Sequence, residues 1–555
     1  MNLNIRVSGP AGLGINSTAE IIWNIFADLG YNILTDIEYE SRIKGWVNYF
    51  DTIVSHSNPY LTKYCDILLA FNKESLLKSA STLSAGWVVF LNAKIFTSLE
   101  ENILAEFAQK NITLHSLDIA DKYDNTYLVS MLAYYLQIPG DVVVENLKKV
   151  FLKKWEVVFE YNKSIYLSTL EKLDFKKSPF VIEKVGEVKP FSYGNKLLAL
   201  WAVDAKLEYY SAYPMTPASS ILSEIIATKK VVYHQAEDEI AVINTALWAS
   251  FTGKRAMVGT SGWGFALMTE ALSFAVQAEF PITAVLSMRA WPSTGTPTFF
   301  EQGDLNFALN PTFWDFDHVV LYPSTLEECY EFAWLALNIA DTYQCVVIML
   351  MDKQFSELSW THWALKTLEV HRGKFLETPP ADYKRYEITP DWISPRVELG
   401  TPNGDFIATS YEHDEYGATS EDPEVKKAMT EKRWRKLSNF FQDQNMMWFE
   451  VINNDAKKML ITTAATSYTA KEFVKNNPEF GLLIIKVLKP IDERILEYIK
   501  DKEEIIFVES NYSGQLENYI SKEFGLKYIP NLQISRLRKY DLFPFYMEDF
   551  ESLKK

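Results

Sequence analysis

Short apolar runs and stretches with helical spacing alternate along most of the chain. In the first part of the sequence, apolar runs predict strands at 5–9, 48–55, 66–71, 87–93 and 112–119. Helical periodicity fills other stretches, at 15–29, 73–82 and 98–109. Strands that alternate with helices predict a parallel, doubly wound sheet. Together with a helical stretch at 124–174, this pattern predicts a first α/β domain over residues 1–175.

The same alternation returns twice further along the chain. A charged segment with two prolines predicts a linker over 176–190. Residues 191–355 and 456–555 again alternate strand and helix patterns, and the irregular, polar segment 356–455 connects these two blocks. A length of 555 residues also exceeds what one core supports, about 250–300 residues. The expected fold class is therefore α/β, with three doubly wound, mainly parallel-sheet domains.

Charge and cysteine usage exclude several classes of protein. The chain has 55 Lys and Arg against 72 Asp and Glu, and a net charge of −17 repels polyanions, so nucleic acid is not the expected partner. Its 3 cysteines are too few for a disulfide framework or for the four thiolates of a typical iron–sulfur cluster. The apolar runs are shorter than a membrane span, and the first residues read as a strand rather than a signal peptide. We therefore expect a cytoplasmic protein that makes no membrane contact.

Polar residues follow four strands expected in the middle block, where open parallel sheets bind their ligands. The first strand ends in Tyr213-Pro214-Met215-Thr216-Pro217, in which Thr216 can cap a helix and present its hydroxyl group. The second ends in Gln235-Ala236-Glu237-Asp238-Glu239. Acids suit a helix N-terminus, but the helix needs only one or two of them, and Glu237 sits at the junction itself. Glu237 is therefore a candidate for acid–base chemistry.

The other two strand ends add a glycine turn and an arginine. Thr260-Ser261-Gly262-Trp263-Gly264 can let a ligand approach the backbone closely. Arg289 directly follows a buried strand, and its planar guanidinium group suits a carboxylate. Each feature alone is also typical of an ordinary turn, a capped helix or an internal salt bridge. Their occurrence at four strand ends of one sheet favours a binding site.

These segments together resemble the alpha subunit of the 2-oxoacid:ferredoxin oxidoreductases, which depend on thiamine diphosphate. The family motifs YPITP, Q-x-E-D-E, TSGPGFSLM and RGGPSTGLPT match Tyr213 to Pro217, Gln235 to Glu239, Thr260 to Met268 and Arg289 to Thr298. The segments around Glu412 and Glu431, and Glu509-Ser510-Asn511-Tyr512-Ser513-Gly514-Gln515-Leu516 near the end, are similar to family segments as well. The resemblance implies that 191–355 is a pyrimidine-type cofactor domain and 456–555 a transketolase-C-like domain.

The first block resembles the gamma domain of the same family, in a fused gamma–alpha arrangement. The family loop G-x-G-G-Q-G reads Gly9-Pro10-Ala11-Gly12-Leu13-Gly14 in this chain, and S-x-I-R-G-G reads Ser41-Arg42-Ile43-Lys44-Gly45-Trp46. The resemblance marks Gly9, Gly12, Gly14, Arg42 and Lys44 as residues of a coenzyme A or gamma-domain loop. Both loops depart from the family pattern, which leaves their ligand open.

The resemblance implies an oxidative decarboxylation of a 2-oxoacid to acyl-coenzyme A and CO2, with electrons passed to ferredoxin. It assigns Glu237 to the pyrimidine nitrogen of thiamine diphosphate, and Tyr213, Pro214 and Gly262 to the cofactor site. Arg289, Thr216 and Thr298 are assigned to the 2-oxoacid. The chain lacks the G-D-G cofactor motif and any C-x-x-C pair, so no metal ligands are expected on it. A beta subunit is expected to carry the diphosphate site, the Mg ion and the 4Fe-4S cluster.

The chain departs from the family pattern at two tryptophans, and the interpretation leaves two other classes of protein open. Trp263 stands where the family has proline, and Trp291 where it has glycine. An indole at 291 either reshapes the acyl pocket, favouring short 2-oxoacids such as pyruvate over 2-oxoglutarate, or packs against the partner subunit. Because the glycine motifs are altered, one alternative is a non-catalytic alpha-like paralogue. A cluster-free thiamine diphosphate enzyme of the transketolase or dehydrogenase type is the other.

Overall fold

The computed structural model of the protein describes residues 2–39, 47–118, 124–153, 155–292, 296–362, 365–443 and 448–554. These residues form two compact units. The first unit comprises Met1–Ser192, Leu358–Ala364 and Tyr546–Lys555, and the second comprises Tyr193–Glu357 and Leu365–Phe545. Among the described residues, no helix is both long and apolar enough to cross a membrane.

An eight-stranded mixed sheet forms the centre of the first unit, in the order β6-β5-β4-β1-β3-β2-β14-β7. The strands are β1 (Asn2–Pro10), β2 (Asn32–Tyr39), β3 (Val47–Ser55), β4 (Cys65–Ala70), β5 (Leu83–Asn92), β6 (Thr113–Leu117), β7 (Phe191–Tyr193) and β14 (Ser359–Thr361). Strands β6, β5, β4 and β1 run parallel, as expected. Strands β1, β3, β2 and β14 pair antiparallel, which the expected doubly wound pattern did not include.

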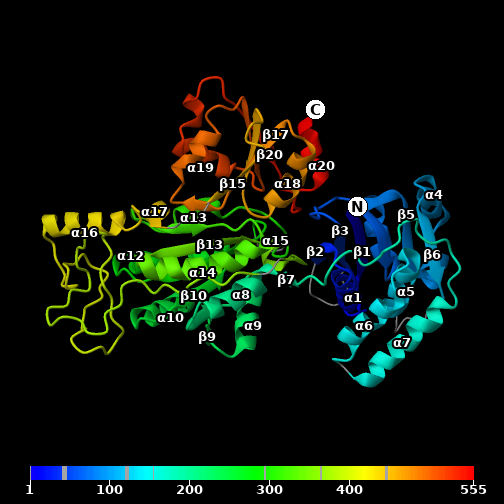
Figure 1. The fold of residues 1–555 in the computed structure, drawn as a ribbon, viewed down its shortest axis with the longest axis horizontal. Helices are drawn as coiled ribbons and strands as arrows, with labels where there is room; N and C mark the ends of the chain where they lie inside the picture. The colour runs from blue at the N-terminus through cyan, green and yellow to red at the C-terminus, as the bar shows by residue number, and fades with distance from the viewer. Residues whose placement is uncertain are drawn as a thin grey trace. The chain divides into compact units, whose positions relative to one another are not determined.

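The helices of the first unit are α1 (Ile15–Asp28), α2 (Lys73–Ser79), α3 (Ala93–Thr97), α4 (Glu101–Gln109), α5 (Asp124–Leu136), α6 (Gly140–Phe151) and α7 (Glu156–Leu170), shown in blue and cyan in Figure 1. Helix α1 buries Ile21, Ile22 and Ile25 in the same core as Ile5 and Val7 of β1. Helices α5, α6 and α7 form the helical stretch expected over 124–174. Apolar side chains at helical spacing therefore place α1 directly behind the glycine loop that ends β1.

The second unit contains a seven-stranded sheet in the order β18-β12-β13-β11-β10-β8-β9. Its strands are β8 (Tyr209–Ala212), β9 (Val232–Gln235), β10 (Ala256–Thr260), β11 (Ile282–Met288), β12 (Val319–Leu321), β13 (Val346–Asp352) and β18 (Val487–Lys489). All neighbours pair in parallel except β12 and β18. Helices α8 (Gly194–Asp204), α9 (Ser219–Thr228), α10 (Glu239–Phe251), α11 (Gly262–Ala266), α12 (Thr269–Gln277), α13 (Leu305–Leu309), α14 (Leu326–Tyr343) and α15 (Lys353–Glu357) accompany it (Figure 1).

A five-stranded sheet in the order β15-β17-β16-β19-β20 completes the second unit. Its strands are β15 (Phe449–Ile452), β16 (Lys458–Thr462), β17 (Phe480–Ile485), β19 (Glu504–Glu509) and β20 (Gln533–Arg538). Helices α16 (Pro423–Arg435), α17 (Phe440–Asp443), α18 (Thr466–Asn476) and α19 (Gln515–Glu523) belong to this unit, and α20 (Met547–Glu551) to the first. The expected α/β class with mainly parallel sheets is confirmed.

Two short segments fall differently from the expected blocks. Leu358–Ala364, expected in the connecting segment, contributes β14 to the sheet of the first unit. Tyr546–Lys555, expected in the last domain, also belongs to the first unit, where the backbone N–H of Met547 donates to the carbonyl oxygen of Leu61. Such long-range pairings leave no local pattern in the sequence.

Candidate active site

The four strand ends that carry the polar motifs are neighbours in the seven-stranded sheet. Strands β11, β10, β8 and β9 lie side by side in this order and run parallel. Their carboxyl ends therefore share one edge of the sheet, where open α/β sheets bind ligands. Along that edge, Arg289 follows β11, Gly262 follows β10, Thr216 follows β8 and Glu237 follows β9. The sequence thus placed these four residues at one edge correctly.

A cavity of about 690 Å³ opens at this edge, within the second unit. Its walls come from two parts of the sequence, one after β10 and β11 and the other after β19. The lining residues are Gly262, Trp263, Ala266, Leu267, Arg289, Trp291, Glu301, Gly303, Asp304, Asn511, Tyr512, Ser513 and Gln515. We call this cavity the Arg289 cavity.

The guanidinium group of Arg289 is only partly satisfied by the chain. Its Nη1 donates to the backbone oxygen of Thr216 at 2.7 Å. Its Nε is buried and has no hydrogen-bond partner among the described residues. Burial lowers the pKa of Arg289 and the nearby carboxylate of Asp304 opposes this effect, but an arginine stays charged near neutral pH. A buried donor without a partner is costly, so this nitrogen points to an anionic group that the cavity receives.

Asp304 lies against the glycine turn that follows β10. A Cβ atom added to Gly262 would come within 2.7 Å of a carboxylate oxygen of Asp304, so only glycine leaves room for this contact. Burial, together with the neighbouring Glu301, raises the pKa of Asp304 to about 6, while Arg289 opposes the rise. Gly262 therefore serves the close packing of a carboxyl group, and its role in cofactor binding stays a prediction.

The three consecutive acids after β9 have three different environments. Asp238 caps α10, because its Oδ1 accepts the backbone N–H of Ala241 at 2.8 Å. Glu239 is buried behind the glycine turn, where a Cβ atom on Gly264 would lie 2.4 Å from its Oε1, and burial raises its pKa. Glu237 is exposed and makes no hydrogen bond or ion pair with the described residues. Helix capping thus accounts for Asp238 and packing for Glu239, but neither accounts for Glu237.

The loop Glu301–Leu305 is tied to the five-stranded sheet by side-chain and backbone hydrogen bonds. The backbone N–H of Gln302 donates to the carbonyl oxygen of Ser510 at 2.7 Å, and its Oε1 accepts the N–H of Ser510 at 3.1 Å. The backbone oxygen of Gln302 accepts the side-chain amide of Asn511 at 3.2 Å. Gln515 donates to the oxygen of Gly303 at 2.7 Å and accepts the N–H of Asn306 at 2.8 Å. These contacts hold Asp304 and Arg289 against the residues after β19.

The motif Glu509 to Leu516 builds the second wall. The buried carboxylate of Glu509 accepts the backbone N–H groups of Leu516 and Glu517 at the start of α19. Asn511 donates to Glu509 and accepts the N–H of Gly514, whose φ of +70° favours glycine. This turn leaves Tyr512 and Ser513 facing the Arg289 cavity. The sequence showed the motif but not that it lines the site.

Three other predicted site residues are less closely involved. Tyr213 and Pro214 are exposed on the loop after β8, and they do not line the Arg289 cavity. Thr298 is half-buried, and its role in substrate binding stays a prediction. Sequence reasoning singled out Trp263 without assigning it a role, and it missed the carboxyl groups of Glu301 and Asp304. Only the motif Glu301-Gln302-Gly303-Asp304-Leu305 directly after the arginine segment gave a signal for them.

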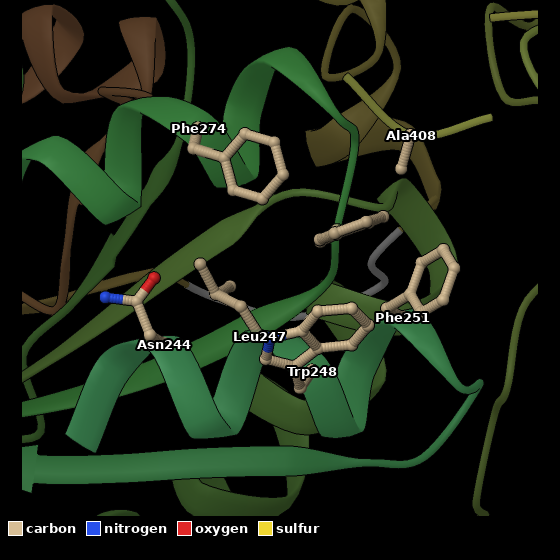
Figure 2. A pocket seen from close by; sticks show the side chains of 7 residues that line it. Asn244, Leu247, Trp248, Phe251, Phe274 and Ala408 are labelled. Carbon is tan, nitrogen blue, oxygen red and sulfur yellow. The ribbon is translucent and has the colours of Figure 1, made fainter. Parts of the chain in front are cut away.

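A second cavity in this unit, of about 220 Å³, is apolar. Figure 2 shows Leu247, Trp248 and Phe251 of α10 and Phe274 of α12 around one space, with Ala408 at its edge. Asn244 supplies the one polar side chain among the described residues that line it. Because these residues include no titratable group, this cavity offers no acid–base chemistry, and the Arg289 cavity remains the candidate active site.

The glycine loop of the first unit borders a cavity of about 560 Å³. Gly12, with φ +98°, and Gly14, with φ +90°, line it together with Asn16, Asn48 and neighbouring apolar residues. Gly9 has a packing role instead, because a Cβ atom there would meet Phe71 at 2.6 Å. Arg42 and Lys44, the other predicted loop residues, lie outside the described part of the chain.

Among the described residues, no group of three or more His, Cys, Asp or Glu side chains is placed to hold a metal ion. The three cysteines, Cys65, Cys329 and Cys345, are buried and free. Burial raises the pKa of the Cys65 and Cys345 thiols to about 12. They are therefore poor thiolate ligands.

An acid, a glycine turn and an arginine at one edge of a parallel sheet place the protein among the α/β proteins that bind a ligand at the carboxyl ends of their strands. A family model described as pyruvate flavodoxin/ferredoxin oxidoreductase, thiamine diphosphate-binding, matches residues 201–432. A model described as pyruvate ferredoxin/flavodoxin oxidoreductase matches residues 4–167. The chain belongs to the 2-oxoacid:ferredoxin oxidoreductase family.

Individual relatives agree with this assignment. The 2-oxoacid:ferredoxin oxidoreductase subunit alpha of a Sulfolobus species is 29% identical over 99% of this chain and 96% of its own length. The 2-oxoglutarate synthase subunit KorA of Methanocaldococcus jannaschii is 29% identical over 57% of this chain and 87% of its own. The solved 2-oxoglutarate:ferredoxin oxidoreductase from Magnetococcus marinus, with 2-oxoglutarate, coenzyme A and succinyl-CoA bound, is 27% identical over 100% of this chain and 99% of that chain, with a TM-score of 0.89.

Proposed function

We propose that this chain is the alpha subunit of a thiamine diphosphate-dependent oxidoreductase. The reaction converts a 2-oxoacid, coenzyme A and two oxidised ferredoxins into acyl-coenzyme A, CO2, a proton and two reduced ferredoxins. The observation that carries the proposal is the buried Nε of Arg289, which lies in a cavity at the sheet edge and has no hydrogen-bond partner among the described residues. Glu237 follows β9 at the same sheet edge, although it does not line that cavity. We further propose that the protein acts in the cytoplasm.

The residues at the sheet edge fit the pyrimidine end of thiamine diphosphate. Glu237 is exposed and makes no hydrogen bond or ion pair with the described residues, so its carboxyl group is available to a bound cofactor. Tyr213 and Pro214 offer exposed apolar surface beside it, and Gly262 leaves the backbone accessible. When bound, the cofactor supplies the nucleophilic carbon and the electron sink that a decarboxylation needs. Glu237 would hold and move a proton at the pyrimidine nitrogen.

Arg289 would bind the carboxylate of the 2-oxoacid. Its Nη1 is already fixed by the oxygen of Thr216, so the guanidinium group is oriented before the substrate arrives. Its free Nε can then donate to a carboxylate oxygen, in a charge-assisted hydrogen bond. The hydroxyl groups of Thr216 and Thr298 complete the proposed substrate site. The partly buried position of Arg289 strengthens this pairing.

The remaining parts of the enzyme are assigned to a partner. Relatives named as alpha subunits imply a second subunit. We propose a beta subunit that holds the cofactor diphosphate, the Mg ion and a 4Fe-4S cluster, because the described residues of this chain offer no metal site. Ferredoxin is the proposed electron acceptor.

The direct test is reduction of ferredoxin by the complex of this chain with its partner subunit. We expect 2-oxoacid- and coenzyme A-dependent reduction, and no activity from either subunit alone. In Arg289→Lys the KM for the 2-oxoacid should rise roughly 10- to 100-fold, because a point charge cannot replace the planar donor pair and about 1.5–3 kcal/mol is lost with a charged hydrogen bond. Steady-state kinetics measure this change.

The control for this substitution is Arg494→Lys, an exposed arginine that pairs with Asp492 at 2.6 Å elsewhere in the second unit. It should leave the KM unchanged. If Arg289→Lys raises the KM for coenzyme A instead, Arg289 belongs to another site. A complex that turns over no 2-oxoacid would identify a non-catalytic paralogue. Turnover without an iron–sulfur absorption band would identify a cluster-free thiamine diphosphate enzyme.

The cavity at the glycine loop is the proposed contact for coenzyme A in the first unit. Gly12, Gly14 and the start of α1 offer backbone N–H groups without an acidic residue in the first turn, which suits a phosphate. Asn48 also lines this cavity, and its buried Oδ1 has no hydrogen-bond partner among the described residues.

We expect Asn48→Leu to raise the KM for coenzyme A about 3- to 10-fold, the loss of one ordinary hydrogen bond of about 0.5–1.5 kcal/mol. The KM for the 2-oxoacid should not change, and thermal stability should not fall, because the replaced oxygen is unpaired in the free protein. Steady-state titrations of each substrate measure both constants. An unchanged KM for coenzyme A would place that ligand elsewhere.

A further inference from the structure

We propose that the Arg289 cavity selects 2-oxoacids with an apolar acyl group, aromatic ones included, and rejects those that carry a second carboxylate. This inference rests on the proposed function. It is carried by the charges and the apolar surfaces that surround Arg289 in the described structure.

The charge of the cavity favours a substrate with a single carboxylate. Arg289 is the one cationic side chain among the described residues that line it. Glu301 and Asp304, in contrast, place two carboxyl groups in the same wall. A dicarboxylic 2-oxoacid that pairs one end with Arg289 would place its second carboxylate close to these acids, with no second cation among the described residues that line the cavity. Like charges in a partly desolvated site repel each other strongly.

The surfaces beside Arg289 are apolar and unusually exposed. Trp291 is 74% exposed, Trp263 61% and Leu267 50%, and all of them line the cavity together with Ala266. Large exposed apolar side chains gathered around one polar anchor are typical of a small-molecule site. Indole rings offer flat surfaces on which an apolar or aromatic acyl group can stack.

The two indoles do not close the cavity. With both rings in place its volume is still about 690 Å³, within the range of about 300–1,000 Å³ that is usual for ligand pockets. An indole that lines an open cavity supplies contact area, whereas one that fills it would restrict the substrate to short acids. The structure therefore favours contact with the acyl group over exclusion of long acyl groups.

Local contacts hold the backbone that carries each indole. The backbone N–H of Trp291 donates to Oε2 of Glu301 at 2.9 Å. Trp263 lies between Gly262 and Gly264, and Gly264 packs against Thr260 and Glu239, where a Cβ atom would come within 2.3 Å of Oγ1 of Thr260. Glu301 thus has two effects: it positions Trp291 and it adds a negative charge to the wall.

The first experiment compares four substrates with the complete complex: phenylpyruvate, 4-methyl-2-oxopentanoate, pyruvate and 2-oxoglutarate. We expect kcat/KM for phenylpyruvate and 4-methyl-2-oxopentanoate to exceed that for 2-oxoglutarate at least tenfold. A preference for 2-oxoglutarate would overturn the inference and leave the proposed function intact. Turnover of none of the four would contradict the proposed function itself.

The second experiment uses Trp291→Ala and Trp263→Ala to decide whether the indoles contact the acyl group or obstruct the cavity. We expect each variant to lower kcat/KM for phenylpyruvate at least fivefold more than for pyruvate, mainly through KM. An increase in kcat/KM for phenylpyruvate would mean that the indoles obstruct the cavity. An unchanged ratio of kcat/KM for phenylpyruvate to that for pyruvate would mean that they do not touch the acyl group. Either result overturns the inference. The matched control is Trp155→Ala, because Trp155 is 75% exposed and belongs to the first unit.

The third experiment removes a negative charge and keeps the hydrogen bond. In Glu301→Gln the amide oxygen can still accept the N–H of Trp291. We expect the ratio of kcat/KM for phenylpyruvate to that for 2-oxoglutarate to fall at least threefold, because the second carboxylate of 2-oxoglutarate meets less repulsion. If this ratio is unchanged, the charge of the wall does not select the substrate and the inference fails.

Discussion

Replacement of Glu237 by glutamine is expected to lower kcat by roughly 10²- to 10⁴-fold, the usual range for loss of a positioned acid or base. Glutamine has the same shape as glutamate, but its amide group can neither take up nor release the proton that the carboxyl group would move at the cofactor. The fold should not change, because the exposed side chain makes no hydrogen bond or ion pair with the described residues.

The neighbouring acids give this experiment its controls. Asp238→Asn keeps an oxygen that can accept the N–H of Ala241, so α10 stays capped and the rate should change little. Glu239 is buried behind the glycine turn, so Glu239→Gln, which keeps the shape of this side chain, should also change the rate little. The measurement is 2-oxoacid-dependent reduction of ferredoxin by the assembled complex, with circular dichroism to check the fold. A rate near that of the wild type in Glu237→Gln would assign the proton transfer to another residue.

The gathering of the four motifs at one sheet edge could be predicted from the sequence, but not their order β11-β10-β8-β9 along it. Each of β8, β9, β10 and β11 is a short apolar run followed by polar residues, and parallel strands necessarily present their carboxyl ends together. Local patterns of this kind are set by neighbours in the chain. For the same reason the parallel strands β1, β4, β5 and β6 of the first unit were predicted correctly.

The second wall of the Arg289 cavity could not be predicted, because it depends on contacts between residues about two hundred positions apart. Gln515 meets Gly303, and Gln302 meets Ser510, only once two separate sheets have packed together. The two carboxyl groups of Glu301 and Asp304 acquire their environments by the same packing. Strand β2 was missed for a similar reason, since its partners in the sheet are antiparallel and its pattern adjoins that of α1.

The connecting segment illustrates a further limit, because the sequence showed it only as irregular and polar. Lys432 and Lys436 are instead buried against Glu279, with Nζ to carboxylate distances of 2.6 and 2.5 Å. Arg385 donates to the backbone oxygen of the same residue at 2.9 Å. Helix α16 is therefore fastened to the end of α12 by a buried ion cluster, which we call the Glu279 cluster.

The Glu279 cluster predicts a large loss of stability when its carboxylate is removed. Burial alone would raise the pKa of Glu279, but Lys432, Lys436 and Arg385 outweigh it and hold the pKa well below its usual range. In Glu279→Gln the ammonium groups of Lys432 and Lys436 stay buried without a carboxylate. Removing one partner of a buried ion pair typically costs about 3–5 kcal/mol. We expect a loss of this size in the free energy of unfolding, measured by urea denaturation.

The lowered pKa of Glu279 also predicts how the stability difference between the wild type and Glu279→Gln changes with pH. A group whose pKa is depressed in the folded protein stabilises it above the unfolded pKa, about 4.3 for glutamate, and the benefit is lost as the pH falls further. The difference in stability between the wild type and Glu279→Gln should therefore be full at pH 7 and shrink below about pH 4. The control is Glu431→Gln on the same helix, whose exposed pair with Arg435 at 3.5 Å should contribute only about 0.3–0.5 kcal/mol. Equal losses in both variants would mean that the buried cluster does not hold α16 in place.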